Sequence, residues 1–319
     1  MFGTLDSLPT VALAPAPTPV EEMPRLARAL PHAPRLLVKR DDTIGFAFGG
    51  NKVRKMRFVA AEALSQNADA LITSGGVQSN HARVTAAAAA KLGLKCILIA
   101  NGECPSRPTA NALLDRLLGA EVRYVASREH RAGAVEQAAA DLRAAGHRPF
   151  IIPIGASTPL GAAAYVQAVR ELLLQTDPPD VIVHATSSGG TQAGLVAGCA
   201  LAGIRTRVLG ISADEPSSVL QRDVRAILEG MKPLLGVDRN LAHSPVRVDD
   251  RFVGAGYGIP TDESREAIEL TARTEAIFLD PTYTAKAMAG LISAVRAAEF
   301  GPDETVLFWH TGGQVGLFA

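Results

Sequence analysis

The stretch "DVIVHATSSGGTQAGLVAG", residues 180–198, decides the fold. Its aliphatic start is typical of a buried strand, a turn of small residues follows, and an alanine- and leucine-rich helix comes next. The free N–H groups of such a turn and the dipole of the following helix favour an anion. An ordinary strand-to-helix turn would contain the same glycines, so a phosphate site and a plain turn both remain open here.

Familiar motifs do not account for this turn. It lacks the Gly-Lys-Ser/Thr of a P-loop, and the spacing of Gly189, Gly190 and Gly194 differs from G-x-G-x-x-G. The run "GAGYG" at 254–258 follows no good strand, so a dinucleotide dehydrogenase is disfavoured. The chain also lacks H-E-x-x-H, Cys/His pairs at ligand spacing and G-x-S-x-G. We therefore expect no metal site and no Ser-His-Asp hydrolase.

Strand and helix patterns alternate along the rest of the chain. This alternation predicts an α/β fold with two open, twisted, mainly parallel sheets flanked by helices. One sheet would belong to a small domain at 51–156, and the other to a large domain made of 1–50 and 157–319. Ligands of such sheets lie beyond the carboxyl ends of the strands, which predicts a site in the cleft between the domains. The other predicted strands are 68–75, 95–101, 121–126, 149–154, 207–213 and 304–310.

Composition excludes several classes of protein. The 319 residues are 47 % hydrophobic and 20 % charged, which is a globular balance. Because 32 basic residues offset 32 acidic ones, we expect a small-molecule partner and neither nucleic acid nor a membrane surface. Three scattered cysteines, no signal-peptide pattern and no long apolar run lead us to expect a cytoplasmic protein.

A second candidate site is "GGVQSNHARVTAAAAAKLG", residues 75–93. Ser79 is a good N-cap for the helix that follows, and capping alone would explain it. Gln78, Asn80 and His81 exceed what a cap requires, so the group could also bind a substrate carboxylate at the helix N-terminus. His81 taken singly is more often structural than catalytic.

Two later stretches end in loops with polar side chains. Tyr257 and Tyr283 lie in turn-rich loops, where a phenol is usually structural. Either could instead act as an acid or a nucleophile if neighbouring cations lowered its pKa. Thr311 follows a strand and precedes two glycines, and it could cap a turn or donate a hydrogen bond to a ring nitrogen.

The segment "FGGNKVRK", residues 48–55, begins a helix with an unusual charge. Lys52, Arg54, Lys55 and Arg57 lie in its first turns, although the N-terminus of a helix is already partially positive. We expect the last three to be surface cations or to lie behind a site, where they offset an anionic ligand.

Taken together, these blocks resemble a known family. Their order, from "KRDDTIGFAFGGNKVRK" through "QSNHARVTAAAAAKLGLKC" and "SSGGTQAG" to "LDPTYTAKAMAGL" and "HTGG", is similar to that of pyridoxal-phosphate enzymes of fold type II. More narrowly, the chain resembles the family of D-cysteine desulfhydrase and 1-aminocyclopropane-1-carboxylate deaminase. The resemblance covers nearly the whole chain. It implies a tryptophan-synthase-β-like fold with the cofactor in the interdomain cleft, and a homodimer.

The resemblance also implies roles for single residues. Lys52 would bind pyridoxal 5'-phosphate covalently and later act as a base beside the substrate α-carbon. The turn that begins at Ser188 would hold the phosphate, and Thr311 would lie near the pyridine nitrogen. The implied catalytic residues are Lys52, Ser79, Tyr257 and Tyr283; the cofactor-binding residues are Lys52, Asn80, Ser188, Gly189, Gly190, Thr191, Thr284 and Thr311; and the substrate-binding residues are Gln78, Ser79, Asn80 and His81.

One position separates the activities within this family. The deaminase has a glutamate after the tyrosine of the "DP-x-Tyr" block, near the pyridine nitrogen, whereas this chain has Thr284. The resemblance therefore favours β-elimination, most simply of D-cysteine to pyruvate, hydrogen sulfide and ammonia. The alternatives are an L-cysteate sulfo-lyase, the deaminase, an amino-acid racemase, or a non-catalytic protein that binds the cofactor or an amino acid.

Overall fold

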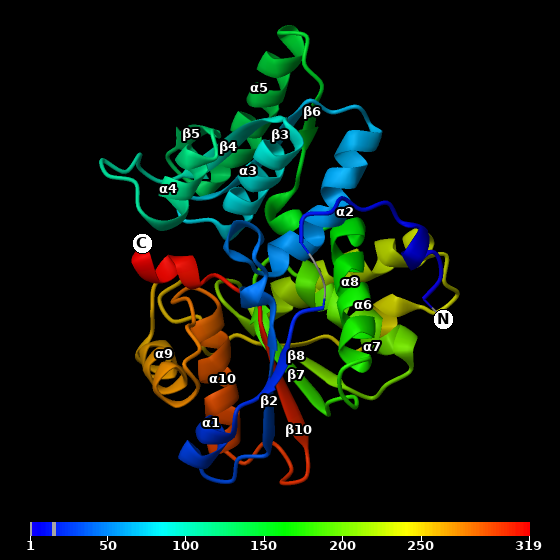
Figure 1. Cartoon of the computed structure of the whole chain (residues 1–319), viewed down its shortest axis with the longest axis vertical. Coiled ribbons are helices and arrows are strands. Elements are labelled where there is room, and N and C mark those ends of the chain that lie inside the picture. Colours follow the sequence, from blue (N-terminus) through cyan, green and yellow to red (C-terminus); the bar gives the residue numbers. More distant parts are fainter. Residues whose placement is uncertain (1, 15–16) are drawn as a thin grey trace.

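The computed structural model describes residues 2–14 and 17–319, and these form two β-sheets (Figure 1). The larger sheet has six strands in the order β1-β2-β10-β7-β8-β9. Its first pair is antiparallel and every other pair is parallel. The strands are β1 (Val20–Glu22), β2 (Arg35–Arg40), β7 (Val181–Thr186), β8 (Arg207–Ser212), β9 (Arg247–Asp249) and β10 (Thr305–His310).

The smaller sheet has four parallel strands in the order β5-β4-β3-β6. In Figure 1 it lies above the larger sheet, and its helix α5 forms the top of the molecule. Its strands are β3 (Ala70–Gly76), β4 (Lys95–Asn101), β5 (Glu121–Val125) and β6 (Pro149–Ile151).

Ten helices within the described residues cover the faces of these sheets. All but α10, which follows α9, come after a strand, and most of them form the crossovers that a parallel sheet needs between its strands. The helices are α1 (Pro24–Ala29), α2 (Asn51–Ser65), α3 (Asn80–Leu92), α4 (Ala110–Leu117), α5 (Arg131–Ala144), α6 (Pro159–Leu173), α7 (Gly190–Ala202), α8 (Ser217–Leu235), α9 (Asp262–Glu275) and α10 (Thr284–Arg296).

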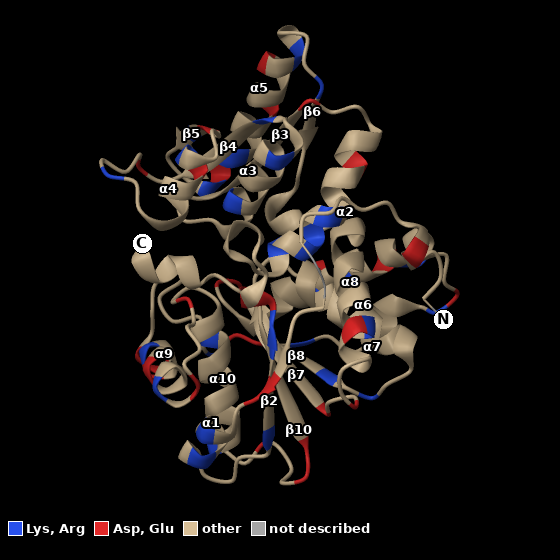
Figure 2. Ribbon diagram, in the orientation of Figure 1, with Lys and Arg blue, Asp and Glu red and all other residues tan. Residues whose placement is uncertain are grey.

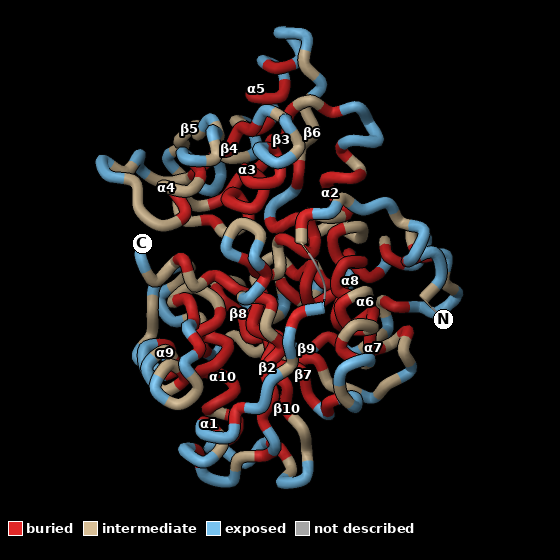
Figure 3. Tube along the Cα trace, viewed as in Figure 1, coloured by how far each residue is buried: buried red, intermediate tan, exposed pale blue. Residues whose placement is uncertain are grey.

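The larger sheet is buried on both faces. Leu307 and Trp309 of β10 point to the core shared with α6, α7 and α8, whereas Val306 and Phe308 point to the core shared with α1, α9 and α10. This alternation follows from the two-residue period of a strand. In Figure 3 the trace of the central strands is mainly buried, whereas exposed residues lie in the outer loops and on the outer faces of helices. The smaller sheet is covered by α2 and α3 on one face and by α5 on the other.

The predicted fold class is confirmed, and each of the predicted strands is present. The sequence did not mark β1, β2 or β9, because β1 and β9 have three residues each and β2 ends in charged residues. Strands β3–β6 fall within 51–156, and we keep 50/51 and 156/157 as proposed domain boundaries. Within the described residues, none of the helices has both the length and the apolar character needed to cross a membrane.

A buried polar cluster around Asp41 joins α2 to the larger unit. The Asp41 carboxylate is fully buried and accepts hydrogen bonds from Arg54 Nε of α2 at 2.9 Å, Tyr165 Oη of α6 at 2.6 Å and Trp309 Nε1 of β10 at 2.8 Å. Thr18 Oγ1 donates a further bond at 3.1 Å. Because its Arg54 partner lies in the first turn of α2, this cluster also fixes the helix that carries Lys52.

We expect Asp41→Asn to lower the free energy of unfolding by about 3–5 kcal/mol, because it leaves the buried Arg54 guanidinium with one carboxylate partner fewer. Urea unfolding followed by tryptophan fluorescence measures the change. Glu22→Gln is the matched control, since it breaks the half-exposed Arg35–Glu22 pair and should cost less than about 1 kcal/mol. Equal effects of the two substitutions would contradict this account.

Candidate functional site

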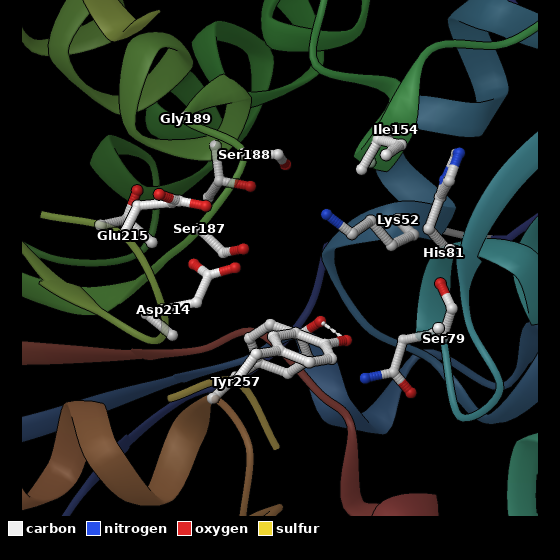
Figure 4. Close-up of a pocket in the computed structure, with 18 of the residues that line it drawn as sticks. Lys52, Ser79, His81, Ile154, Ser187, Ser188, Gly189, Asp214, Glu215 and Tyr257 are labelled. Carbon is white, nitrogen blue, oxygen red and sulfur yellow. Dashed lines mark hydrogen bonds between the residues drawn. The ribbon is translucent and has the colours of Figure 1, made fainter. Parts of the chain in front are cut away.

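A cavity of about 390 Å³ opens between the two sheets, at the carboxyl ends of their strands. Residues after β3 and at the start of α2 line one side, and the turn after β7 and the loop after β8 line the other (Figure 4). This is the position that parallel α/β sheets use for ligands. Figure 4 shows Lys52, Ser79 and His81 on one side and Ser187, Ser188, Asp214 and Glu215 on the other.

Lys52 enters the cavity from the first turn of α2. Gly50 precedes it with φ of 99°, and a Cβ at this position would lie 2.9 Å from the carbonyl oxygen of Thr311, so only glycine fits. Burial lowers the pKa of the Lys52 amine to about 8, and it is the one cause of the shift, so no carboxylate counters it. The side chain is therefore partly uncharged near neutral pH, as a nucleophile or base requires.

Of the two positions left open for the other cations of α2, the surface is excluded for Arg54 and Lys55, because both are buried. Arg54 pairs with Asp41 and Glu171, both at 2.8 Å. Lys55 is fully buried, and its amine donates to the Gly155 carbonyl at 3.2 Å and to Ser157 Oγ at 3.3 Å. Figure 2 shows the basic residues of the first turns of α2 lying inside the molecule, between the two sheets.

The turn after β7 lies against Lys55. A Cβ added at Gly190, the first residue of α7, would lie 2.8 Å from Lys55 Nζ. Ser157 Oγ bonds Ser188 Oγ at 2.7 Å and accepts from the Gly190 N–H at 3.2 Å. Burial, together with the charge of Lys52, holds the pKa of Lys55 well below its usual value. Lys55 and the free N–H groups at the start of this 13-residue helix could together hold a phosphate-sized anion.

Ser79 and His81 come together at the start of α3. Ser79 is the N-cap, and its Oγ accepts from the Ala82 N–H at 3.2 Å. His81 Nε2 lies 2.8 Å from Thr73 Oγ1, and burial together with the two lysines holds the pKa of His81 well below its usual value. Gln78 does not line the cavity, because its amide bonds the backbone of Thr109 and Asn111 at the start of α4.

Tyr257 and Tyr283 lie side by side in the cavity wall, with their hydroxyl oxygens 2.5 Å apart (Figure 4). From the sequence, neighbouring cations could have lowered the pKa of either tyrosine. One cation is present, since the guanidinium of Arg128 lies 5.2 Å from the ring centre of Tyr257. Burial is the larger effect, and it raises the pKa of both phenols. Both tyrosines are therefore protonated at neutral pH and can donate a proton.

The two threonines implied to lie near a ring nitrogen differ in position. Thr311 follows β10 and lines the cavity. Thr284 does not line it: its hydroxyl donates to Asp280 Oδ1 at 2.7 Å and accepts from the Asp280 N–H at 2.8 Å. Thr311 is thus the hydroxyl that remains available to a ligand.

Sequence reasoning missed the charged residues at the mouth of the cavity. Arg128, which precedes α5, lies 3.7 Å from Asp214 and 3.5 Å from Glu215, which follow β8. Arg131 lines the same region. The position of Asp214 and Glu215 directly after a predicted strand was a signal that could have found them. Within residues 2–14 and 17–319, no group of three or more His, Cys, Asp or Glu side chains could hold a metal ion.

Comparison with known proteins agrees with this geometry. Residues 11–312 match the family model described as "Pyridoxal-phosphate dependent enzyme". The chain is 38 % identical to D-cysteine desulfhydrase of Klebsiella pneumoniae (strain 342), over 99 % of this chain and 97 % of that one. It is 39 % identical to a putative 1-aminocyclopropane-1-carboxylate deaminase of Pyrococcus abyssi, over 98 % and 94 %.

Solved structures show the same relationship. The crystal structure of a homologue of 1-aminocyclopropane-1-carboxylate (ACC) deaminase superposes with a TM-score of 0.91 at 37 % identity, over 98 % of this chain and 94 % of that one. A pyridoxal 5'-phosphate-dependent aspartate racemase superposes with a TM-score of 0.70 at 17 % identity, over 93 % and 90 %, which supports the fold alone.

The lowered pKa of Lys52 predicts an unusual reactivity. In the ligand-free protein, acylation of Lys52 should reach half its maximal rate near pH 8, because only the uncharged amine reacts. Mass spectrometry of peptides labelled between pH 6 and 11 measures this profile, with the exposed Lys91 as the reference in the same sample. A midpoint above pH 10 for Lys52 would rule out a desolvated amine at this position.

Proposed function

This chain belongs to the pyridoxal-phosphate-dependent enzyme family, and on that premise we propose that it is a lyase which eliminates the β-substituent of a small amino acid, most simply D-cysteine. The reaction converts D-cysteine and water into pyruvate, hydrogen sulfide and ammonia. The observation that carries the proposal is Lys52, a desolvated amine that faces a pair of protonated tyrosines and an anion-binding turn across one cavity.

The residues of the cavity fit pyridoxal phosphate. Lys55, Ser157 and the N–H groups at the start of α7 suit its phosphate, and Lys52 is placed to bind its aldehyde carbon. A Cβ at Gly155 would lie 3.1 Å from Lys52 Nζ, so the glycine keeps open the space beside the amine. We assign the cofactor to Lys52, Asn80, the turn from Ser188 to Thr191, and Thr311.

When bound, the cofactor withdraws electrons from the substrate α-carbon and stabilises the negative charge left there by proton removal. Lys52 removes that proton, since its pKa of about 8 keeps part of the amine uncharged at neutral pH. Ser79 and the first N–H groups of α3 bind the substrate carboxylate, with His81 beside them. The Tyr257–Tyr283 pair donates a proton to the departing sulfur.

Position 284 supports D-cysteine over the cyclopropane amino acid. The resemblance places a glutamate near the pyridine nitrogen of the deaminase, whereas Thr284 is uncharged and its hydroxyl is bound by Asp280. The Asp280 carboxylate also accepts hydrogen bonds from the N–H groups of Thr282, Tyr283 and Thr284. Its oxygens are therefore bound within its own loop and do not replace the glutamate of the deaminase. Thr311, which lines the cavity, would then be the hydroxyl available to the pyridine nitrogen, and this would suit a good leaving group such as thiolate.

Other reactions on the same residues are the second candidate. The 39 % identical relative named as a putative deaminase favours opening of 1-aminocyclopropane-1-carboxylate, and an L-cysteate sulfo-lyase or a racemase would need the same lysine. A non-catalytic protein that binds the cofactor or an amino acid is the candidate outside enzymes, and a desolvated Lys52 gives it little support.

Purified protein loaded with pyridoxal phosphate should release pyruvate and sulfide from D-cysteine in equal amounts, and Lys52→Ala should lose this turnover by at least about a thousandfold, because it removes both nucleophile and base. The panel includes L-cysteine, L-cysteate, β-chloro-D-alanine, D-serine and the cyclopropane amino acid. Faster turnover of another member would replace D-cysteine. A loss of optical activity without keto-acid would indicate a racemase.

We further propose a cytoplasmic homodimer. Phe48, Leu117 and Phe318 each expose more than half of their surface, as apolar residues of an interface do. They lie on neighbouring segments, because the 314–318 turn packs on α4 and Gln314 Nε2 donates to the Asp42 carbonyl, shortly before Phe48. All three cysteines are free, which suits a reducing compartment. Light scattering should give twice the chain mass, and a single-chain mass would contradict the dimer.

A further inference from the structure

Arg83 of α3 is a buried cation that the proposed chemistry does not use. Only 1 % of its surface is exposed. Its Nη1 donates to Asn80 Oδ1 at 2.9 Å and to Asn111 Oδ1 at 2.8 Å, and its Nη2 donates to the Gly49 carbonyl at 3.0 Å. One guanidinium therefore joins the start of α3, the start of α4 and the glycine turn that precedes Lys52.

Asn111 completes the same network from α4. It is fully buried, and its Nδ2 donates to Asn80 Oδ1 at 2.9 Å and to the Gln78 carbonyl at 2.9 Å. Its own N–H donates to Gln78 Oε1 at 2.9 Å. Every polar group of Asn111 that faces α3 is thus engaged.

These bonds determine which way the Asn80 amide points. A guanidinium can only donate, so the Asn80 atom that meets Arg83 must be the carbonyl oxygen. The Asn111 amide donates to the same oxygen, which leaves the Asn80 Nδ2 on the opposite side. Asn80 lines the cavity, and its Nδ2 lies 3.1 Å from where a Cβ at Gly313 would be, next to Thr311 and Gly312 of the cavity wall.

The burial of Arg83 with incomplete hydrogen bonding lowers the stability of the fold, which indicates that this residue has a role beyond packing. Arg83 forms no ion pair within the described residues; the acidic groups that act on it, Asp115 and Asp280, do so only at longer range. Its Nε is buried without a hydrogen-bond partner, and burial lowers its pKa to about 10. A buried, incompletely bonded cation is costly, and in some proteins such groups specify one geometry.

We propose that Arg83 is a positioning residue that, together with Asn111, fixes the Asn80 amide so that its N–H groups, and not its carbonyl oxygen, face the cofactor. This inference rests on the proposed function. With the amide held in this way, an Asn80 N–H can donate to the phenolic oxygen of the cofactor, where negative charge gathers. A rotated amide would place an oxygen against that charge and weaken the electron withdrawal on which the reaction depends.

The test is the pH titration of the absorption band of the protein-bound cofactor without substrate. A donor to the phenolic oxygen stabilises the deprotonated form, so its loss should move the titration midpoint to higher pH. We expect Asn80→Ala to raise the midpoint by about one pH unit, the worth of one hydrogen bond to a charged group. Arg83→Lys and Asn111→Ala should each give a shift in the same direction, and Arg116→Lys, an exposed change on α4, should give none.

A double-mutant cycle separates positioning from a general charge effect. If Arg83 acts through Asn80, then Arg83→Lys should add nothing to the midpoint of Asn80→Ala. A midpoint unchanged in both Arg83→Lys and Asn111→Ala, or fully additive shifts, would overturn the inference. Should Arg83→Lys not fold, Asn111→Ala decides alone, because it keeps the guanidinium. No shift in Asn80→Ala itself would instead overturn the proposed cofactor contact of Asn80, and with it the inference.

Discussion

The site depends on buried basic side chains that the protein leaves without carboxylate partners. Lys55 and Arg83 are buried, yet their hydrogen-bond partners are carbonyl, hydroxyl and amide oxygens. Nearby, Arg54 is paired with Asp41 and Glu171, so the fold can supply carboxylates to a buried cation. Unpaired buried charge is costly unless an anion joins it. An anionic cofactor with a phosphate and a phenolic oxygen meets that requirement, because Lys55 lies at one end of the site and Arg83 behind the other.

The two sheets bring these charges together. The carboxyl ends of β3, β7, β8 and β10 all open on one cavity, so residues that are far apart in the chain line the same wall. The Asp41 cluster then fixes the first turn of α2 against α6 and β10. Lys52 is thereby held at the junction of both sheets, where burial lowers the pKa of its amine.

Much of the fold could be predicted from the sequence, because parallel strands that are buried on both faces read as aliphatic runs followed by glycine turns. The same signal located Ser79 and the turn at Ser188, whereas Lys52 stood out as one of several cations after two glycines and took its role from the family resemblance. The signal could not distinguish a buried cation from an exposed one, so both positions stayed open for Lys55, which is buried. The spacing of residues does not reveal the hydrogen-bond partner of a side chain either. Gln78 accepts a bond from the first turn of α4, and Thr284 donates one to Asp280, although the neighbours of both residues line the cavity. Ser157 reaches the turn at Ser188 only through long-range packing.

The most direct test of this account is where the cofactor becomes attached. Protein incubated with pyridoxal phosphate, reduced with borohydride and digested should contain one cofactor per chain, on the peptide that contains Lys52. Lys52→Ala should contain none and should still bind the phosphate end of the cofactor through Lys55. Attachment at another lysine in the unmodified protein, or no attachment at all, would contradict the central claim that the unpaired buried cations form a site for this anionic cofactor.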